Sequence, residues 1–78
     1  MEGELLKTYA HHVPSAAGQA HIAALRTAFS QLQQTVNDLC PSSRERSCAS
    51  TKLEEAAMWA VKSIVINDDD AVVQPAGA

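Results

Sequence analysis

Two arginines and a threonine near a predicted helix start are the residues best suited to chemistry in this chain. Arg44 and Arg46 follow Ser43, where a long helix is predicted to begin, and Thr51 lies two turns further on. A helix start offers free backbone N–H groups and the positive end of the helix dipole, and the planar guanidinium group fits phosphate oxygens. The pattern favours binding of a small anion. The alternative is that both arginines are solvated or paired with acids such as Glu45.

Tyr9 is the second candidate, and it is the only tyrosine in the chain. Its ring could cover a nucleobase and its hydroxyl could donate a hydrogen bond, whereas the alternative is packing against the protein's own core. His11 and His12 are adjacent and point in different directions, and together with His21 they lack a metal-binding spacing. We therefore predict no metal site and no cofactor.

Catalytic patterns are weak. Cys40 or Cys48 could be combined with a histidine, but no residue is placed to orient a base, and the chain has no P-loop and no carboxylate pair spaced for hydrolysis. An enzyme is therefore disfavoured. Two cysteines without a signal peptide are typical of free thiols inside the cell, so we expect no disulfide.

The charge distribution limits the partners. The net charge is −3, and Asp68, Asp69 and Asp70 supply the excess, so the body of the chain is neutral. Long nucleic acids usually require a broad positive surface, whereas a small phosphorylated ligand requires only a few well-placed cations. The apolar runs of the chain, such as Ala56–Val61 and Ile64–Ile66, are far shorter than the roughly 20 residues that cross a bilayer. We expect a soluble intracellular protein that binds neither long nucleic acid nor a membrane.

These residues must be positioned by helices. Glu2–Tyr9 can form a short helix, and residues 10–18 are predicted to be a loop because they contain Pro14 and Gly18. A helix is predicted from about Ala20 to Leu39, because apolar residues recur there in steps of three and four. They are Ile22, Leu25, Phe29, Leu32, Val36 and Leu39.

A second long helix should follow Cys40-Pro41, because the residue before a proline disfavours helical backbone. Ser42 and Glu45 have the spacing of a capping box. Two long helices joined by so short a link must pack antiparallel. The small and apolar residues predicted to face the first helix are Ala49, Leu53, Ala56, Ala57, Ala60 and Ile64.

The other sides of the second helix predict association between copies. Met58, Trp59, Val65 and Ile66 point away from the alanine face, and exposed apolar area of this kind usually marks an interface. The fold class is therefore all-α, a short N-terminal helix plus an antiparallel two-helix hairpin, assembled as a homo-oligomer. We divide the chain into a hairpin domain at residues 1–67 and a flexible tail at residues 68–78, which has a charge run, a proline and a glycine but no periodicity.

Residues 43–64, SRERSCASTKLEEAAMWAVKSI, resemble the C-terminal hairpin helix of the phage anti-CBASS and anti-Thoeris proteins, small helical sponges that sequester cyclic nucleotide immune signals. Upstream, Tyr9–Pro14 and Ile22–Arg26 resemble the family's ligand-gripping tyrosine, its loop and its first long helix. The resemblance implies an oligomer, commonly a hexamer, in the cytoplasm of the infected bacterial host.

The resemblance also implies ligands. Tyr9 and Arg26 match the positions that hold cyclic dinucleotides between protomers, and Arg44, Arg46, Ser47, Thr51 and Lys52 are local candidates for a second site that takes cyclic trinucleotides. Other relatives prefer cyclic ADP-ribose isomers. The candidate ligand-binding residues are Tyr9, His12, Arg26, Arg44, Arg46, Ser47, Thr51 and Lys52.

The resulting hypothesis is a sponge that binds cyclic oligonucleotides without cleaving them. The leading alternative is a helical interaction module that binds a host protein through Met58 and Trp59. A small hydrolase of cyclic nucleotides and a nucleic-acid binder are further alternatives, and the neutral body counts against the latter.

Overall fold

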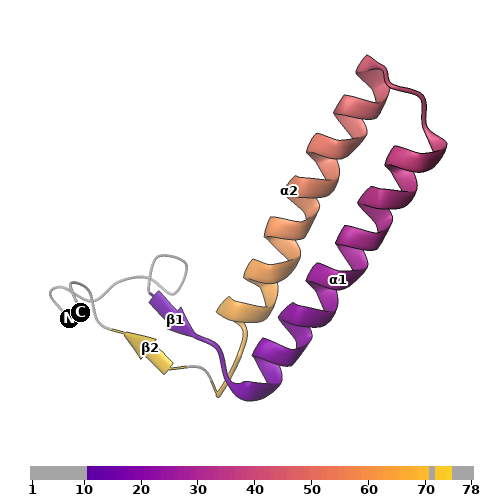
Figure 1. Cartoon of the computed structure of the whole chain (residues 1–78). Helices are drawn as coiled ribbons and strands as arrows, with labels where there is room; N and C mark the ends of the chain where they lie inside the picture. Colours follow the sequence, from indigo (N-terminus) through magenta and orange to yellow (C-terminus); the bar gives the residue numbers. More distant parts are fainter. Residues whose placement is uncertain (1–10, 71, 75–78) are drawn as a thin grey trace, which may run out of the picture.

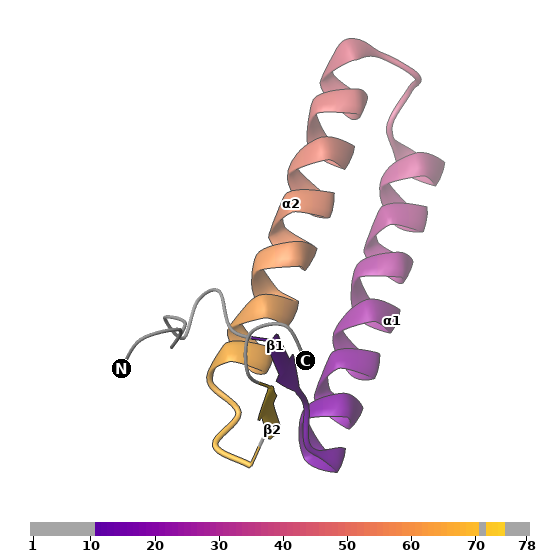
Figure 2. The ribbon, with the colours of Figure 1, turned by 90° about the vertical axis from the view of Figure 1, so that its left-hand side faces the viewer.

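The computed structural model describes residues 11–70 and 72–74, and two long helices dominate it. Helices α1 (Ala16–Leu39) and α2 (Arg44–Ile66) lie side by side and antiparallel (Figure 1), which confirms the predicted helical hairpin. Strands β1 (His11–Val13) and β2 (Val72–Gln74) lie at the base of the hairpin, opposite the link between the helices (Figure 2). The short helix predicted at residues 2–9 lies outside the described residues.

Helix α1 begins earlier than predicted because Ser15 caps it. The Ser15 hydroxyl accepts a hydrogen bond from the Gly18 N–H at 3.2 Å, so Gly18 lies in the first turn rather than in a loop. The helix ends at Leu39, as the Cys40-Pro41 pair predicts. The predicted boundaries of this element were therefore wrong at its start and right at its end.

Helix α2 is capped one residue later than predicted. The side chain of Ser43, not of Ser42, accepts a hydrogen bond from the Arg46 N–H at 3.1 Å. Glu45 lies in the first turn, where its charge suits the helix dipole, but it is not at the third helical position that a capping box requires. At the other end, the Asn67 side chain donates to the Ser63 carbonyl at 2.8 Å.

The core between the two helices is thin. Ile22 is the buried apolar side chain of the described part, and Leu25, Phe29 and Val36 are half-buried further along α1. On α2 the half-buried residues of the predicted face are Leu53, Ala57, Ala60 and Ile64.

Two leucines of α1 do not join this contact. Leu32 and Leu39 are 47% and 78% exposed, against the prediction for both. Gln33 takes the inner position instead, and its amide donates to the Ser50 hydroxyl of α2 at 2.9 Å. The predicted inner face of α1 was wrong here, because steps of three and four allow either Leu32 or Gln33 to face α2. The hydrogen bond to Ser50 favours Gln33.

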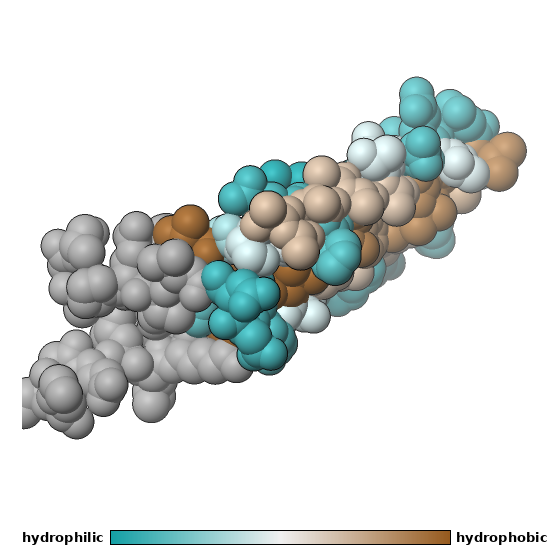
Figure 3. Space-filling view, turned by 90° about the horizontal axis from the view of Figure 1, so that it is seen from below, coloured by the Kyte–Doolittle hydropathy of each residue, from teal (hydrophilic) through white to brown (hydrophobic). Residues whose placement is uncertain are grey.

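The outer side of α2 is apolar in its middle. Met58 and Trp59 are 68% and 62% exposed, as predicted. Val65 and Ile66, in contrast, are half-buried, because they lie at the base, where β1 contacts α2. Ala49 and Ala56 of the predicted inner face are exposed. Seen from below, brown and tan groups reach the surface along the hairpin between teal side chains (Figure 3).

The two strands are a feature that the sequence did not predict. β1 and β2 pair antiparallel, with His11 opposite Gln74, His12 opposite Val73 and Val13 opposite Val72. Part of the segment predicted to be a flexible tail is thus a strand in this structure, while the division of the chain at residue 67 stays a prediction. Neither helix of the described residues has a stretch long and apolar enough to cross a bilayer.

Candidate ligand-binding site

The first turns of α2 carry a shallow hollow on the side that faces away from α1. Its volume is about 250 Å³, and it is lined by Arg44, Ser47, Cys48, Thr51 and Lys52. These positions recur in steps of three and four along one face of the helix, so the hollow is formed by side chains rather than by the free N–H groups of the helix start. All of its walls come from α2, and it is open on its outer side.

The polar groups of the hollow differ in how far they are already committed. Arg44 is exposed and makes no hydrogen bond or ion pair within the described residues. The Thr51 hydroxyl donates to the Ser47 carbonyl at 3.0 Å, which leaves its oxygen free to accept. Lys52 forms an exposed ion pair with Glu55, with 3.6 Å between Nζ and Oε2. Of the two cations that line the hollow, Arg44 is therefore the more available to an anion.

Arg46 has a different environment from Arg44. Its guanidinium Nη1 donates to the Cys40 carbonyl at 3.2 Å and to the Asn37 carbonyl at 3.4 Å. These carbonyls lie at the C-terminal end of α1, where helical carbonyls lack intrahelical partners. Arg46 is half-buried in this position and is not among the residues that line the hollow.

Two further candidate residues, Arg26 and His12, lie away from the hollow, on α1 and on β1. Arg26 is exposed on α1 and makes no hydrogen bond or ion pair in the part that the structure describes. It precedes Leu39 by thirteen residues, or roughly 20 Å of helix. His12 is half-buried in β1, and Tyr9 lies outside the described residues. Arg26 and Arg44 of one chain therefore cannot contact the same small ligand.

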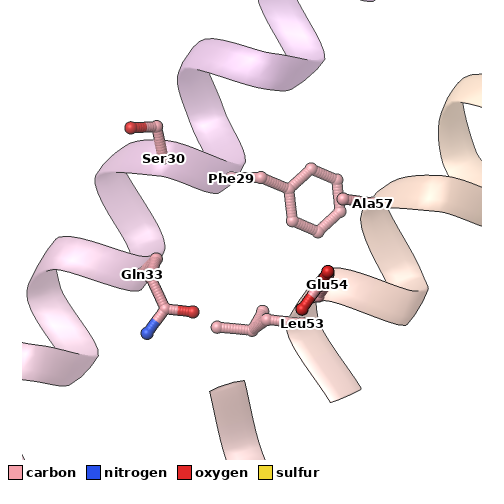
Figure 4. Close-up of a pocket in the computed structure, with 6 residues that line it drawn as sticks. All are labelled: Phe29, Ser30, Gln33, Leu53, Glu54 and Ala57. Atoms are coloured by element: carbon pink, nitrogen blue, oxygen red, sulfur yellow. The ribbon is translucent and has the colours of Figure 1, made fainter. Parts of the chain in front are cut away.

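A second hollow lies between the helices, with a volume of about 180 Å³ (Figure 4). Phe29 of α1 and Leu53 of α2 point into it, and Ala57 lies beside the Phe29 ring. Glu54 is the charged residue of this lining, which has no cation. The hollow is therefore poorly suited to a phosphate.

Cys48 is the site residue that the sequence reasoning missed. It follows Arg44 by one helical turn and precedes Lys52 by another. Helical spacing alone could have placed it beside them. Among the described residues, no group of three histidines, cysteines or acids lies close enough together to hold a metal ion.

Comparison with known proteins bears on this arrangement. The family described as "Acb2/Tad1, hairpin domain" matches residues 1–65, which include both helices except for the last residue of α2. This chain belongs to the Acb2/Tad1 hairpin-domain family. The hollow at the start of α2 lies within the matched residues, as do Tyr9, His12 and Arg26. The comparisons with curated proteins and with solved structures gave no match. Asp68 and β2 follow the end of the Acb2/Tad1 match.

Proposed function

We propose that this chain binds and sequesters cyclic oligonucleotide messengers without cleaving them, and so blocks anti-phage signalling in the cytoplasm of an infected bacterium. Membership of the Acb2/Tad1 family supports the class of function. The observation that carries the proposal is the hollow on α2, where four candidate residues come together on one face. They are Arg44, Ser47, Thr51 and Lys52.

The chemistry of the hollow suits a phosphodiester ring. Arg44 offers a planar pair of donors to two phosphate oxygens, and charge-assisted bonds of this type are the strong ones. The Ser47 hydroxyl is a further donor, and the Thr51 oxygen can accept from a base or a ribose hydroxyl. Lys52 must leave Glu55 to take part, which costs little because the pair is exposed.

The lining favours binding over hydrolysis. Cys48 is its one thiol, and no histidine or carboxylate is among the five lining residues. A thiol nucleophile is usually activated by an adjacent base. We therefore infer that a cyclic nucleotide held here is released intact.

We propose that a second copy of the chain closes the open side of the hollow. Met58 and Trp59 point to the same outer side of α2 as Arg44 and Thr51, because 3.6 residues per turn bring these positions to within about a third of a turn. Trp59 lies roughly 12 Å along the helix from Thr51. An interface through Met58 and Trp59 therefore brings the surface of another protomer close to the hollow and provides its missing wall. The thin core supports such an assembly, for which a hexamer is our proposal.

We further propose two separate sites in each chain. Tyr9, His12 and Arg26 are assigned to cyclic dinucleotides, with Tyr9 stacking on a base and Arg26 binding a phosphate. The hollow on α2 is assigned to cyclic trinucleotides. Cyclic ADP-ribose isomers are the other ligands to be tested at both sites.

Calorimetric titration with a panel of cyclic di- and trinucleotides tests the proposal, with Arg44→Ala compared with Lys62→Ala. Lys62 is also a cation of α2, but it lies over the Trp59 ring at 5.5 Å and outside the hollow. We expect Arg44→Ala to weaken cyclic trinucleotide binding by about 1.5–3 kcal/mol, or roughly 10- to 150-fold, and Lys62→Ala to change it little. Equal losses in the two variants would contradict the assignment of the hollow.

The alternative hypothesis is an interaction module in which Met58 and Trp59 bind a host protein. The exposure of these two side chains is the observation in its favour. Thermal unfolding separates the two readings, because a ligand at about 100 times its Kd stabilises the folded state by about 2.7 kcal/mol. A sponge is stabilised by at least one ligand of the panel, and the module by none. Chromatography of the ligand recovered after heat denaturation tests the hydrolase alternative, which requires a cleaved product.

A further inference from the structure

A carboxylate from beyond the end of α2 ties the base of the hairpin. Asp68 Oδ2 accepts hydrogen bonds from the Ser15 backbone N–H and from the Ser15 hydroxyl, both at 2.8 Å, and the hydroxyl also lies 3.1 Å from Oδ1. Ser15 is the N-cap of α1, so the negative charge of Asp68 lies at the positive end of the α1 dipole. This contact joins residues that are 53 positions apart in the chain.

The absence of a side chain at residue 18 makes room for this carboxylate. Gly18 is buried, and a Cβ atom placed there would overlap Asp68 Oδ2 and lie 3.4 Å from the Pro14 Cβ. The glycine therefore permits a close approach that any other residue would obstruct. Gly18, Ser15 and Asp68 form one fitted contact.

The sheet provides a second tie between the same two segments. β1 ends two residues before Ser15, and β2 begins four residues after Asp68. All three residues of β1 have partners in β2. Asp68 and β2 together hold the stretch from His11 to Gly18, which leads into α1.

These contacts lie at the segment that follows Tyr9. His12 is in the middle of β1, opposite Val73, and Tyr9 precedes the strand by two residues. A side chain that must stack on a base needs a fixed starting point, because a loosely held arm loses conformational entropy when it binds. Within the described residues, β2 is the strand that pairs with β1.

We propose that Asp68 and β2 form a C-terminal clasp that positions β1 and, with it, the candidate ligand-binding residue His12. Asp68 is a positioning residue, since it acts through Ser15 and β1 rather than by touching the ligand. The inference rests on the proposed function and deepens it, because it assigns a role in cyclic dinucleotide binding to residues that follow the family match, which ends at residue 65. The clasp acts on the proposed cyclic dinucleotide site and not on the hollow at the start of α2.

The test compares the full chain with Asp68→Ala and with a chain ending at Asn67. Asp69→Ala is the matched control, because it removes the same charge one residue away and its side chain makes no hydrogen bond or ion pair within the described residues. The first measurement is hydrogen exchange of the backbone amides of His11, His12, Val13 and Ser15, since Pro14 has no N–H. The second is the affinity for a cyclic dinucleotide and for a cyclic trinucleotide.

We expect Asp68→Ala and the shortened chain to exchange faster at these backbone amides, to bind the cyclic dinucleotide at least tenfold more weakly, and to bind the cyclic trinucleotide within twofold of the parent. Asp69→Ala should match the parent in all three. Unchanged exchange, or equal losses of both ligands, overturns the positioning role. A parent that binds neither nucleotide overturns the proposed function, while the exchange measurement still decides whether Asp68 holds β1.

Discussion

Arg44 and Arg46 are separated by one residue, yet their side chains lie in different environments. Arg44 lies open in the hollow on α2, whereas Arg46 donates to two carbonyls at the end of α1. A cation that satisfies terminal carbonyls usually adds several tenths of a kcal/mol to stability. The pair therefore offers a direct comparison between the binding role proposed for Arg44 and the structural contacts of Arg46.

We expect Arg46→Ala to lower the free energy of unfolding by about 0.5–1.5 kcal/mol. Arg44→Ala should leave it within about 0.5 kcal/mol of the parent, because its side chain is exposed and unpaired within the described residues. Urea unfolding of both variants at one protein concentration measures the difference. A larger loss of stability in Arg44→Ala than in Arg46→Ala would reverse the two assignments.

The rate at which Cys48 is alkylated measures whether the hollow is occupied, and this test needs no mutation. Both cysteines are exposed, but Cys48 lines the hollow while Cys40 caps α1. A cyclic trinucleotide at about ten times its Kd occupies most sites, so alkylation of Cys48 should slow roughly tenfold if the bound form does not react. Mass spectrometry follows both thiols in one sample. Cys40 is the internal control, and equal slowing of both cysteines would indicate a general effect of assembly.

The contact between α1 and the segment after α2 depends on the fit of Gly18 against Asp68. Gly18→Ala should destabilise the parent, because the new Cβ displaces the carboxylate from Ser15. In an Asp68→Ala background the same change should stabilise the protein by up to about 1 kcal/mol, since alanine is the better helix former. The double-mutant cycle, measured by urea unfolding, isolates the coupling. The same sign in both backgrounds would mean that Asp68 does not occupy the site in solution.

The clasp should also respond to acid. The Ser15 N–H, followed by the Ser15 hydroxyl, holds the pKa of Asp68 below its ordinary value, with smaller help from the Asp70 N–H and from His21, while partial burial opposes the shift. A depressed pKa contributes stability that is complete above the ordinary pKa of about 3.9 and is lost as the pH falls through the folded value. The stability difference between the parent and Asp68→Asn should thus be present at pH 5 and shrink below about pH 4. Chemical unfolding across this range measures it, and a difference that grows on acidification would contradict the contact.

The whole molecule is too thinly packed to expect a stable lone protomer. In the described part Ile22 is the one buried apolar side chain, while Met58 and Trp59 are mostly exposed. Burial of such large side chains between copies removes apolar area from water and adds the stability that the hairpin lacks. We expect assembly and ligand binding to be coupled, because the open side of the hollow faces the same way as this surface.

We expect Met58→Gln combined with Trp59→Gln to lower the mass measured by light scattering and to make thermal unfolding less dependent on protein concentration. Leu39→Gln is the matched control, because Leu39 is 78% exposed and lies at the other end of the hairpin. A mass that stays that of the parent in the double variant would place the interface elsewhere. A mass that falls equally in the control would show that any loss of apolar surface has this effect.

The helical hairpin was predictable because local patterns define it. Apolar residues in steps of three and four define α1, Cys40-Pro41 ends it, and the short link requires antiparallel packing. Grouping of Arg44 with Thr51 also followed from helical spacing, whereas Lys52 was expected only from the resemblance to the family. The exact inner face did not, since the choice between Leu32 and Gln33 depends on a hydrogen bond to Ser50, which comes from the other helix.

The base of the hairpin was decided by tertiary structure alone. Two three-residue strands carry too little periodic signal to be read from sequence, and Asp68 looked like one acid in a run of three. Only the return of α2 brings Asp68 to Ser15 and β2 to β1. The physical reason is distance along the chain: periodicity and capping report on neighbours within a few residues, whereas a contact across 53 positions exists only once both helices have packed.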